Sequence, residues 1–586
     1  MRVAIVVTNR FITTSHYICC MREIPIGVDN FKELMEKRGY YVDKTPFIAD
    51  VLGSTLTKVF LYTRPRRFGK SLNLSMLDAY LNMDYAGNTW FEGLAISEKR
   101  CNDSLKNSYP VIKLDFKRTA GEDYTECLNK VHVLISDTCS RFEYLVESEK
   151  IPASYIDRFT KVIDGTCNDA ELSASILHLC EMLEMHHGKK AVVLIDEYDS
   201  PLNTIYGKKE HERVLVFIKD LLSNALKGND SLEFAVVTGV MQISKESIFS
   251  GLNNILVNNV FSTESDEMFG FTADEVRKLC DDNGHPEKYE EARQWYDGYV
   301  FGNAEIYNPW SILNYVRSGF KPDEYWAGTS GNSIISTLLD KADKAVYENL
   351  NRLGSGSTID CRIDPRISYA DMETTNGIYS VMVLTGYLKA VPSERRYLLS
   401  IPNDEMYGVF AKMIADRFDS PLSAALDSFC NAVISNDPDG ISNGLSSLMM
   451  EILSSRVLDH EHSYQAFTAG ILLNLHGRYS MFADGERGKG FYDILLESNQ
   501  GNRPHILMEF KKVRSNARDD TMRKVSRTAL EQIRDRKYFH GLKGDVLLYG
   551  VAVRGKDVVV TSDLRHPRQR RPDSPDTEPD GWKACG

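Results

Sequence analysis

The chain has 586 residues with an ordinary globular composition, 42% hydrophobic and 26% charged; at roughly 150 residues per domain this suggests about three to four compact units. The net charge of −12 excludes a chain-wide attraction to nucleic acid or an anionic membrane, so such a contact needs a local basic patch. No segment approaches the roughly 18 apolar residues of a membrane span. The 11 cysteines contain no CxxC pair. We therefore expect a cytoplasmic protein with reduced thiols and no membrane association.

Changes in composition and periodicity divide the chain into six segments. In two segments, short apolar runs alternate with helical stretches, and a helical pattern dominates the part of the chain between these two segments. The C-terminal end is rich in Pro, Asp and Arg. In chain order we expect a leader (1–21), an α/β domain (22–262), a helical lid domain (263–400), a helical connector (401–455), a second α/β domain (456–560) and a disordered tail (561–586).

The first α/β domain contains a candidate phosphate-binding loop. Its apolar runs, 59–62, 111–115, 191–196 and 234–238, are typical of buried strands in a parallel sheet. The first run leads into a loop that ends in Gly69-Lys70-Ser71 at the start of a helix. Backbone N–H groups there can cradle phosphates, while Lys70 reaches the β- and γ-phosphates and Ser71 ligates Mg²⁺.

The motif is incomplete on its own. GxxxxGK[ST] places glycine at position 64, where this chain has Arg64. Taken alone, the loop therefore leaves open the alternative of a basic strand-to-helix turn that binds nothing.

A pair of acidic residues favours the phosphate-binding interpretation. The third apolar run ends in Asp196-Glu197. An aspartate at the carboxyl end of a buried strand can hold the Mg²⁺ shell, and the next glutamate can polarise the attacking water. Ligands bind at this edge of open α/β sheets. The loop and the acidic pair together predict an ATP site. Gly69, Lys70, Ser71 and Asp196 would be its ligands, and Glu197 the catalytic base.

Three further residues are candidate nucleotide contacts. Thr238 ends the fourth run, where it can sense the γ-phosphate or simply end a strand. Arg66 and Arg67 in the loop can contact phosphate or a partner, although loop arginines are usually just solvated.

The second α/β domain contains a different acidic pattern. Strand 491–496 contains Asp493, and after a hairpin strand 505–511 contains Glu509 and Lys511. Glu509 and Lys511 point to the same side, because side chains two apart on a strand share a face. If the strands pair, Asp493 approaches Glu509, and two carboxylates suit Mg²⁺ or Mn²⁺. A metal there would activate water against a scissile phosphate, with Lys511 stabilising the pentavalent state.

The same domain has a local surplus of positive charge. The stretch Lys511–Lys537 holds ten Lys or Arg against four Asp or Glu. It can contact a phosphate backbone, which makes nucleic acid the expected partner. A solvated basic helix is the alternative.

Several short motifs occur together in the chain. They are Pro25–Gly27, Tyr41–Thr45, Arg64–Ser71, Ile195–Asp199, Ser247–Asn254, Trp295–Tyr299 and Tyr307–Trp310. This set resembles the prokaryotic AAA-ATPase-like family, whose members typically carry a C-terminal PD-(D/E)XK nuclease-superfamily domain. The resemblance extends from about residue 22 to 560, and the family's loop has the same Arg-Pro-Arg-Arg start. It implies ATP binding through Lys70 and Ser71, with Mg²⁺ near Asp196.

The resemblance also bears on single residues. It implies a metal role for Glu486, in the Gly-rich turn 485–490, and it places Gln532 on a helix beside the metal site. Two positions depart from the family pattern: Gln242, where members often carry Arg or Lys, and Phe491, where a basic residue is usual. These departures weaken the expected transition-state stabilisation and phosphate contact.

We therefore expect an α/β chain with an N-terminal P-loop NTPase-like parallel sheet, a helical middle domain and a C-terminal restriction-endonuclease-like α/β domain. The predicted function is ATP hydrolysis coupled to a metal-dependent phosphodiesterase that acts on nucleic acid, with closure of the helical domain as the link. The alternative is an ATP-binding regulatory or interaction module with an inactive nuclease fold. DNA versus RNA and the oligomeric state are open at this stage.

Overall fold

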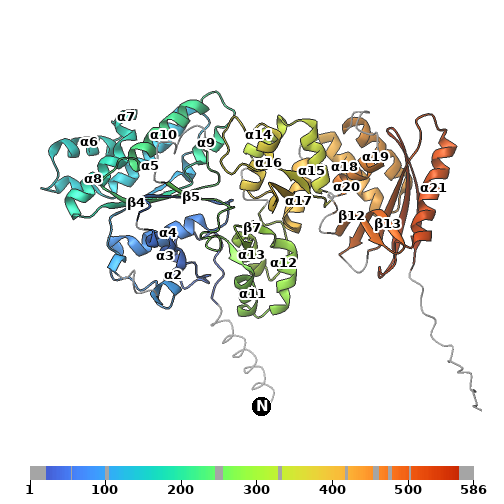
Figure 1. The fold of residues 1–586 in the computed structure, drawn as a ribbon, viewed down its shortest axis with the longest axis horizontal. Coiled ribbons are helices and arrows are strands. Elements are labelled where there is room, and N and C mark those ends of the chain that lie inside the picture. Colours follow the sequence, from blue (N-terminus) through green and yellow to red (C-terminus); the bar gives the residue numbers. More distant parts are fainter. Residues whose placement is uncertain are drawn as a thin grey trace, which may run out of the picture. The chain divides into compact units, whose positions relative to one another are not determined.

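The computed structural model forms two compact units, one of residues up to 353 with 357–410 and the other of residues 354–356 with those from 411 on (Figure 1). It describes residues 22–54, 56–98, 104–243, 255–326, 333–354, 356–415, 420–452, 461–472, 475, 478–499 and 503–566. The predicted leader and residues 567–586 of the predicted tail lie outside these ranges. Within them, no helix is both long and apolar enough to cross a membrane.

The first unit is built on a five-stranded parallel sheet with the strand order β2-β3-β4-β1-β5. Its strands are β1 (Val59–Thr63), β2 (Val111–Asp115), β3 (Ala191–Asp196), β4 (Leu232–Gly239) and β5 (Ile255–Asn258). The first four confirm the predicted apolar runs. Strand β5, only four residues long and partly exposed, was not predicted because it contains no long apolar run.

Helices cover both faces of this sheet, which explains why its inner strands are buried almost throughout. In Figure 1, helices α2 to α4 lie on one side of the sheet and α5 to α10 on the other. These helices are α2 (Phe31–Glu36), α3 (Pro46–Gly53), α4 (Lys70–Leu81), α5 (Tyr124–Ser140), α6 (Ala153–Ile163), α7 (Asp169–Ser173), α8 (Ser175–His187), α9 (Ser200–Thr204) and α10 (His211–Leu226).

The middle region is helical, as predicted, but it also contains two small sheets. Its helices are α11 (Ala273–Asp282), α12 (Tyr289–Tyr296), α13 (Pro309–Arg317), α14 (Ser333–Asp340), α15 (Lys344–Gly354), α16 (Thr375–Leu384) and α17 (Asp404–Ala415). One sheet joins β6 (Phe271–Thr272), β8 (Ala304–Tyr307) and β7 (Tyr299–Phe301), and the other joins β10 (Lys389–Ser393), β11 (Arg396–Ser400) and β9 (Ile359–Cys361). Strands of two to five residues leave little periodicity to detect in a sequence.

The second unit is a five-stranded mixed sheet with helices on both faces (Figure 1). Only β14 and β15 pair in parallel. Helix α21 packs on one face, while α18, α19 and α20 share a hydrophobic core with the other. The elements are β12 (Tyr479–Arg487), β13 (Gly490–Ser498), β14 (His505–Lys512), β15 (Val546–Arg554), β16 (Asp557–Arg565), α18 (Ser420–Ile434), α19 (Pro438–Ile452), α20 (Glu461–Leu472) and α21 (Asp519–Arg536).

The second unit is larger than the predicted domain of residues 456–560. Helices α18 and α19, expected as a connector, are part of its core. The hydroxyls of Ser442 and Ser446 on α19 accept hydrogen bonds from the backbone N–H groups of Val560 and Val558 on the edge strand β16. Strand β16 also runs to Arg565, beyond the expected end at residue 560. These helices belong to the unit because α19 covers the open edge of the sheet at β16.

Candidate functional site

The phosphate-binding candidate is the loop between β1 and α4. Arg67 and Gly69 both adopt positive φ, 70° and 83°. Such alternation turns successive backbone N–H groups towards one side and forms an anion-binding concavity. Helix α4 then begins at Lys70, and Gly69 at its N-cap provides no side-chain hydrogen bond. The first turn of α4 therefore keeps N–H groups for a phosphate.

Lys70 is buried at the centre of this loop. Its Nζ donates to the carbonyl oxygens of Arg64 at 2.9 Å and Pro65 at 2.8 Å. Burial lowers the pKa of its amine, and the charges of Glu197 and Asp196 oppose that shift. The amine and the two predicted carboxylates therefore lie close enough for their charges to act on one another.

Asp196 and Glu197 stand at the carboxyl end of β3. Asp196 is 4% exposed, and its Oδ1 accepts a hydrogen bond from the Thr238 hydroxyl on the neighbouring strand β4. Burial raises the pKa of the Glu197 carboxyl, and nearby Lys70 lowers it. A carboxylate with a raised pKa is suited to accept a proton. Thr238 thus lies in the site, through its contact with Asp196.

Ser71, Arg66 and Arg67 surround the same loop. Ser71 is partly exposed on the first turn of α4, next to Lys70. Burial raises the pKa of the Glu197 carboxyl. The positive charges of Lys70 and Arg66 lower it. Arg67 is exposed. Arg66, Arg67 and Ser71 therefore lie on the same loop and first helical turn as Lys70.

Arg64, at the position where the simple motif has glycine, has a structural role. Its guanidinium is fully buried and donates to the carbonyl oxygens of Thr63 at 2.9 Å and Asn258 at 3.1 Å, and to Asn258 Oδ1 at 2.6 Å. The rings of Phe269 and Phe301 lie 5.1 and 5.2 Å from it. Burial lowers its pKa to about 9. This residue therefore attaches the loop to β5 and to the middle region.

Two residues after the acidic pair were missed by the sequence interpretation of the site. Asp199 Oδ2 accepts hydrogen bonds from the backbone N–H groups of Val240 at 2.9 Å and Met241 at 3.1 Å, and from Asn203 at 3.1 Å. The Tyr198 hydroxyl donates to the Met241 carbonyl at 2.7 Å. They tie the loop after β3 to the segment after β4. The Asp-Glu-Tyr-Asp motif was the available signal, but only its first pair suggested chemistry.

In the second unit, Asp493 and Glu509 meet where β13 and β14 separate. The ladder between these strands ends at Ile494 opposite Met508, and Asp493 Oδ2 accepts a hydrogen bond from the Phe510 N–H at 2.5 Å. The carboxylate of Asp493 is thereby held beside the residue that follows Glu509. As the strand alternation predicts, Met508 and Phe510 point into the core on the other face.

Glu509 is held from the α21 side of the sheet. It is 1% exposed, and its Oε1 accepts hydrogen bonds from Lys511 Nζ at 3.0 Å and from the side-chain amide of Gln532 on α21. The Gln532 amide also donates to the hydroxyl of the buried Tyr538, at 3.1 Å. Asp493, Glu509, Lys511 and Gln532 therefore form one polar group between the sheet and the helix.

The structure does not bring Glu486 into this group. Glu486 lies within β12, not in a turn, and pairs with the exposed Phe491 on β13. Among the described residues, no three His, Cys, Asp or Glu side chains converge. The turn after Glu486 is held instead at the end of α21, since the Lys489 N–H donates to the Arg536 carbonyl at 2.8 Å.

Comparisons with known proteins match both units. Residues 25–249 match the family described as a predicted AAA-ATPase, and residues 459–563 match the PD-(D/E)XK nuclease superfamily. The chain is an AAA-ATPase-like protein with a PD-(D/E)XK nuclease-superfamily domain. Both polar groups described above lie inside the matched ranges.

A protein of Azotobacter chroococcum mcd 1 is also similar to this AAA-ATPase-like protein. It is 28% identical over 393 residues, which cover 66% of this chain and 68% of the relative. It is named "Uncharacterized protein in vnfD 5'region".

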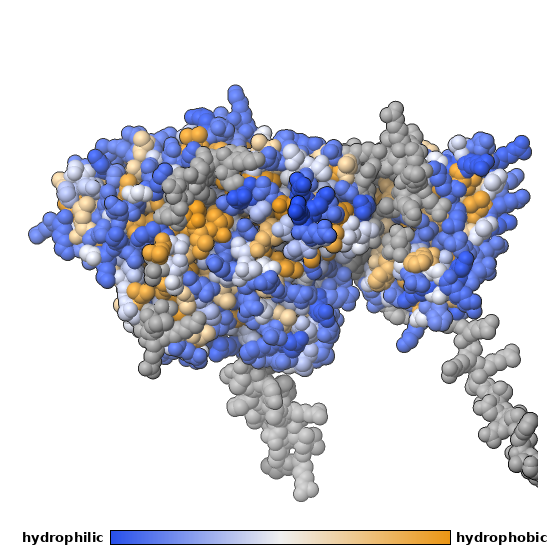
Figure 2. Space-filling model, in the orientation of Figure 1, coloured by the Kyte–Doolittle hydropathy of each residue, from blue (hydrophilic) through white to orange (hydrophobic). Residues whose placement is uncertain are grey.

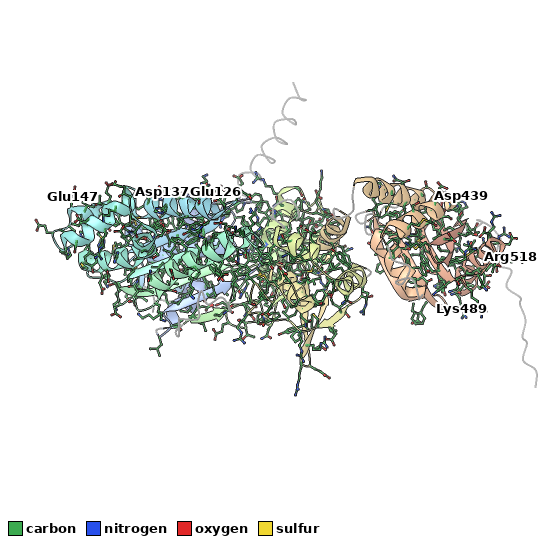
Figure 3. The ribbon with its side chains drawn as sticks, turned by 90° about the horizontal axis from the view of Figure 1, so that it is seen from above. Glu126, Asp137, Glu147, Asp439, Lys489 and Arg518 are labelled. Carbon is green, nitrogen blue, oxygen red and sulfur yellow. The ribbon has the colours of Figure 1, made fainter. Side chains whose placement is uncertain are left out.

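The nuclease-superfamily domain carries its basic residues on the outside. Those of α21 and its flanks that are exposed include Arg514, Arg518, Arg523, Lys524, Arg527, Arg534 and Lys537. Lys489, on the β12–β13 turn, and Arg518, at the start of α21, both extend from the surface (Figure 3). The visible exterior of the domain is largely hydrophilic, with small apolar patches (Figure 2). The positive surplus seen in the sequence is therefore accessible to an anionic partner.

Proposed function

We propose that the AAA-ATPase-like unit binds ATP with Mg²⁺ and hydrolyses it. The observation that carries the proposal is the convergence of Lys70, Asp196 and Glu197 at the carboxyl edge of the parallel sheet. The residues present fit the ligand. Ser71 is accessible beside the loop, and the hydroxyl of Thr238 orients the Asp196 carboxylate. Ser71 and Asp196 would hold Mg²⁺, which would neutralise phosphate charge.

The roles of the side chains follow from their positions. Lys70 exchanges its two carbonyl partners for β- and γ-phosphate oxygens, which explains why a buried amine is kept at this place. Glu197 accepts the proton of the attacking water, for which the raised pKa of its carboxyl is suited. Thr238 keeps Asp196 in the orientation that a metal ligand needs.

The second unit is proposed to be a metal-dependent phosphodiesterase that acts on nucleic acid. Asp493 and Glu509 supply oxygen ligands that suit Mg²⁺ or Mn²⁺. A bound ion would supply an activated water and a positive charge at the scissile phosphate. Gln532 fixes the Glu509 carboxylate, and Lys511 supplies a second positive charge beside it. The exposed basic residues of α21 would hold the phosphate backbone.

The test is a cleavage assay with single-stranded DNA, duplex DNA and RNA in Mn²⁺ or Mg²⁺, with and without ATP. We expect metal-dependent cleavage by the wild type and at least a ~100-fold loss in Glu509→Gln. Lys70→Ala should lose ATP hydrolysis and show whether cleavage depends on it. Absence of ATP hydrolysis by the wild type would overturn the first proposal, and absence of any cleavage would overturn the second.

A second candidate is an ATP-binding module whose nuclease fold only binds a partner. Two observations favour it: the Phe510 N–H donates to Asp493, and the described residues contain no three-carboxylate cluster. This alternative predicts nucleic-acid binding that does not depend on metal, with no cleavage under any condition of the assay.

A further inference from the structure

Stabilisation of the γ-phosphate needs positive charge beyond Lys70. Gln242, which follows β4, is neutral. Its side chain is 9% exposed, and its Oε1 has no hydrogen-bond partner among the described residues. Besides Lys70 and a bound Mg²⁺, further positive charge at this loop can come from Arg66 and Arg67, whose charges interact with that of Glu197.

Arg67 has a strained backbone conformation within the loop. It adopts φ of 70°, a left-handed conformation that is unfavourable for a residue other than glycine. Strained backbone of this kind persists only where the surroundings impose it, and it is frequent at ligand-binding sites. Here the guanidinium lies over the indole ring of Trp310, with Cζ 4.2 Å from the ring centroid. A cation–π contact of this kind stabilises the arginine in one place.

Trp310 is itself rigidly held. It lies at the start of α13, where its backbone N–H donates to Asn308 Oδ1 at 2.9 Å and its indole N–H donates to the Tyr325 carbonyl at 3.0 Å. Asn308 is fully buried at the end of β8. The ring is therefore a fixed surface that the middle region presents to the loop.

The same loop contacts the middle region at two further points. The backbone N–H of Gly270 donates to the Phe68 carbonyl at 3.1 Å, and the Phe68 ring lies 5.1 Å from that of Tyr299. Phe68 is next to Arg67 in the chain, so these contacts help to fix the position of the loop relative to the Trp310 ring. The region expected as a mobile lid is thus packed directly on the phosphate-binding loop.

We propose that Trp310 is a positioning residue that holds the Arg67 guanidinium at the phosphate-binding loop, where it contacts the γ-phosphate of ATP. The AAA-ATPase-like unit would then supply its own arginine to the phosphate. This inference rests on the proposed ATP binding. In this proposal the middle region does not act as a lid. It positions an arginine of the nucleotide site.

Nucleotide binding tests the inference without relying on turnover. Titration calorimetry with ATP and ADP in Mg²⁺ should show that Arg67→Ala lowers ATP affinity about 10- to 100-fold and leaves ADP affinity within about threefold. Trp310→Ala should lower the same preference for ATP by about tenfold, and Trp310→Phe, which keeps a weaker aromatic face, by less. Trp90→Phe is the matched control, because Trp90 makes a similar contact with Lys32, at 5.6 Å.

A double-mutant cycle separates positioning from general stability. If Trp310 acts through Arg67, the double variant that carries both Arg67→Ala and Trp310→Ala should bind ATP no more weakly than the single variant Arg67→Ala. Additive losses, equal losses for ADP and ATP, or an unchanged preference in Arg67→Ala would each overturn the inference. If the wild type binds ATP and ADP but does not hydrolyse ATP, the proposed hydrolysis is refuted, whereas the binding results for Arg67 and Trp310 can still be interpreted.

Discussion

Glu405 allows a prediction of how stability depends on pH. Its carboxyl, on α17, is fully buried and accepts hydrogen bonds from the Ser311 hydroxyl at 2.8 and 3.0 Å and from the Trp326 N–H at 2.8 Å. Burial raises its pKa to about 8, against an ordinary value of 4.5, and the hydrogen bonds oppose this shift. The folded protein therefore retains a proton that the unfolded chain has already lost.

The sign of the effect follows from the raised value. A carboxyl with a higher pKa in the folded state contributes stability that is complete below pH 4.5 and is lost as pH rises through about 8. At 1.36 kcal/mol for each pKa unit, the whole change is of order ~5 kcal/mol, or about 1.4 kcal/mol for each pH unit within that window. Glu405→Gln removes the titration and should flatten this slope.

Urea unfolding followed by tryptophan fluorescence is a suitable assay, since Trp90, Trp295, Trp310 and Trp326 all lie in the first unit. Between pH 6 and 8 the wild type should lose about 2 kcal/mol more than Glu405→Gln. The exposed Glu290→Gln is a control that should follow the wild type. Parallel curves for the wild type and Glu405→Gln over this range would refute the reasoning.

Three further predictions test other contacts. Arg64→Lys should lower the free energy of unfolding of the first unit by about 2–4 kcal/mol, because lysine cannot repeat the contacts with Asn258; an unchanged urea midpoint would contradict this. Glu197→Gln should keep ATP affinity within about threefold in calorimetry and lower turnover at least ~100-fold, and full turnover would exclude its role as the base. Gln532→Ala should weaken Mn²⁺ binding to the second unit by about 10- to 100-fold, measured by titration calorimetry, whereas equal affinity would remove Gln532 from the site.

The sequence by itself determined the elements whose signal is local. The four long apolar runs became strands of the parallel sheet, and the Gly69-Lys70-Ser71 turn and the Asp196-Glu197 pair stood at the ends of two of them. In a parallel sheet, strand ends with the same direction meet at one edge, so their meeting could also be predicted. The alternation of Glu509 and Lys511 against Met508 and Phe510 followed from the strand period of two.

Tertiary structure alone decided the parts that depend on residues far apart in the chain. Arg64 became a structural residue because Asn258, 194 positions later, lies beside it. Glu486 is on β12 opposite Phe491, and among the described residues it completes no three-ligand cluster with Asp493 and Glu509. Trp310 came to face Arg67 for the same kind of reason. Periodicity and motifs record what a residue does to its neighbours in sequence, whereas these contacts are set by how whole elements pack, and no local pattern contains that information.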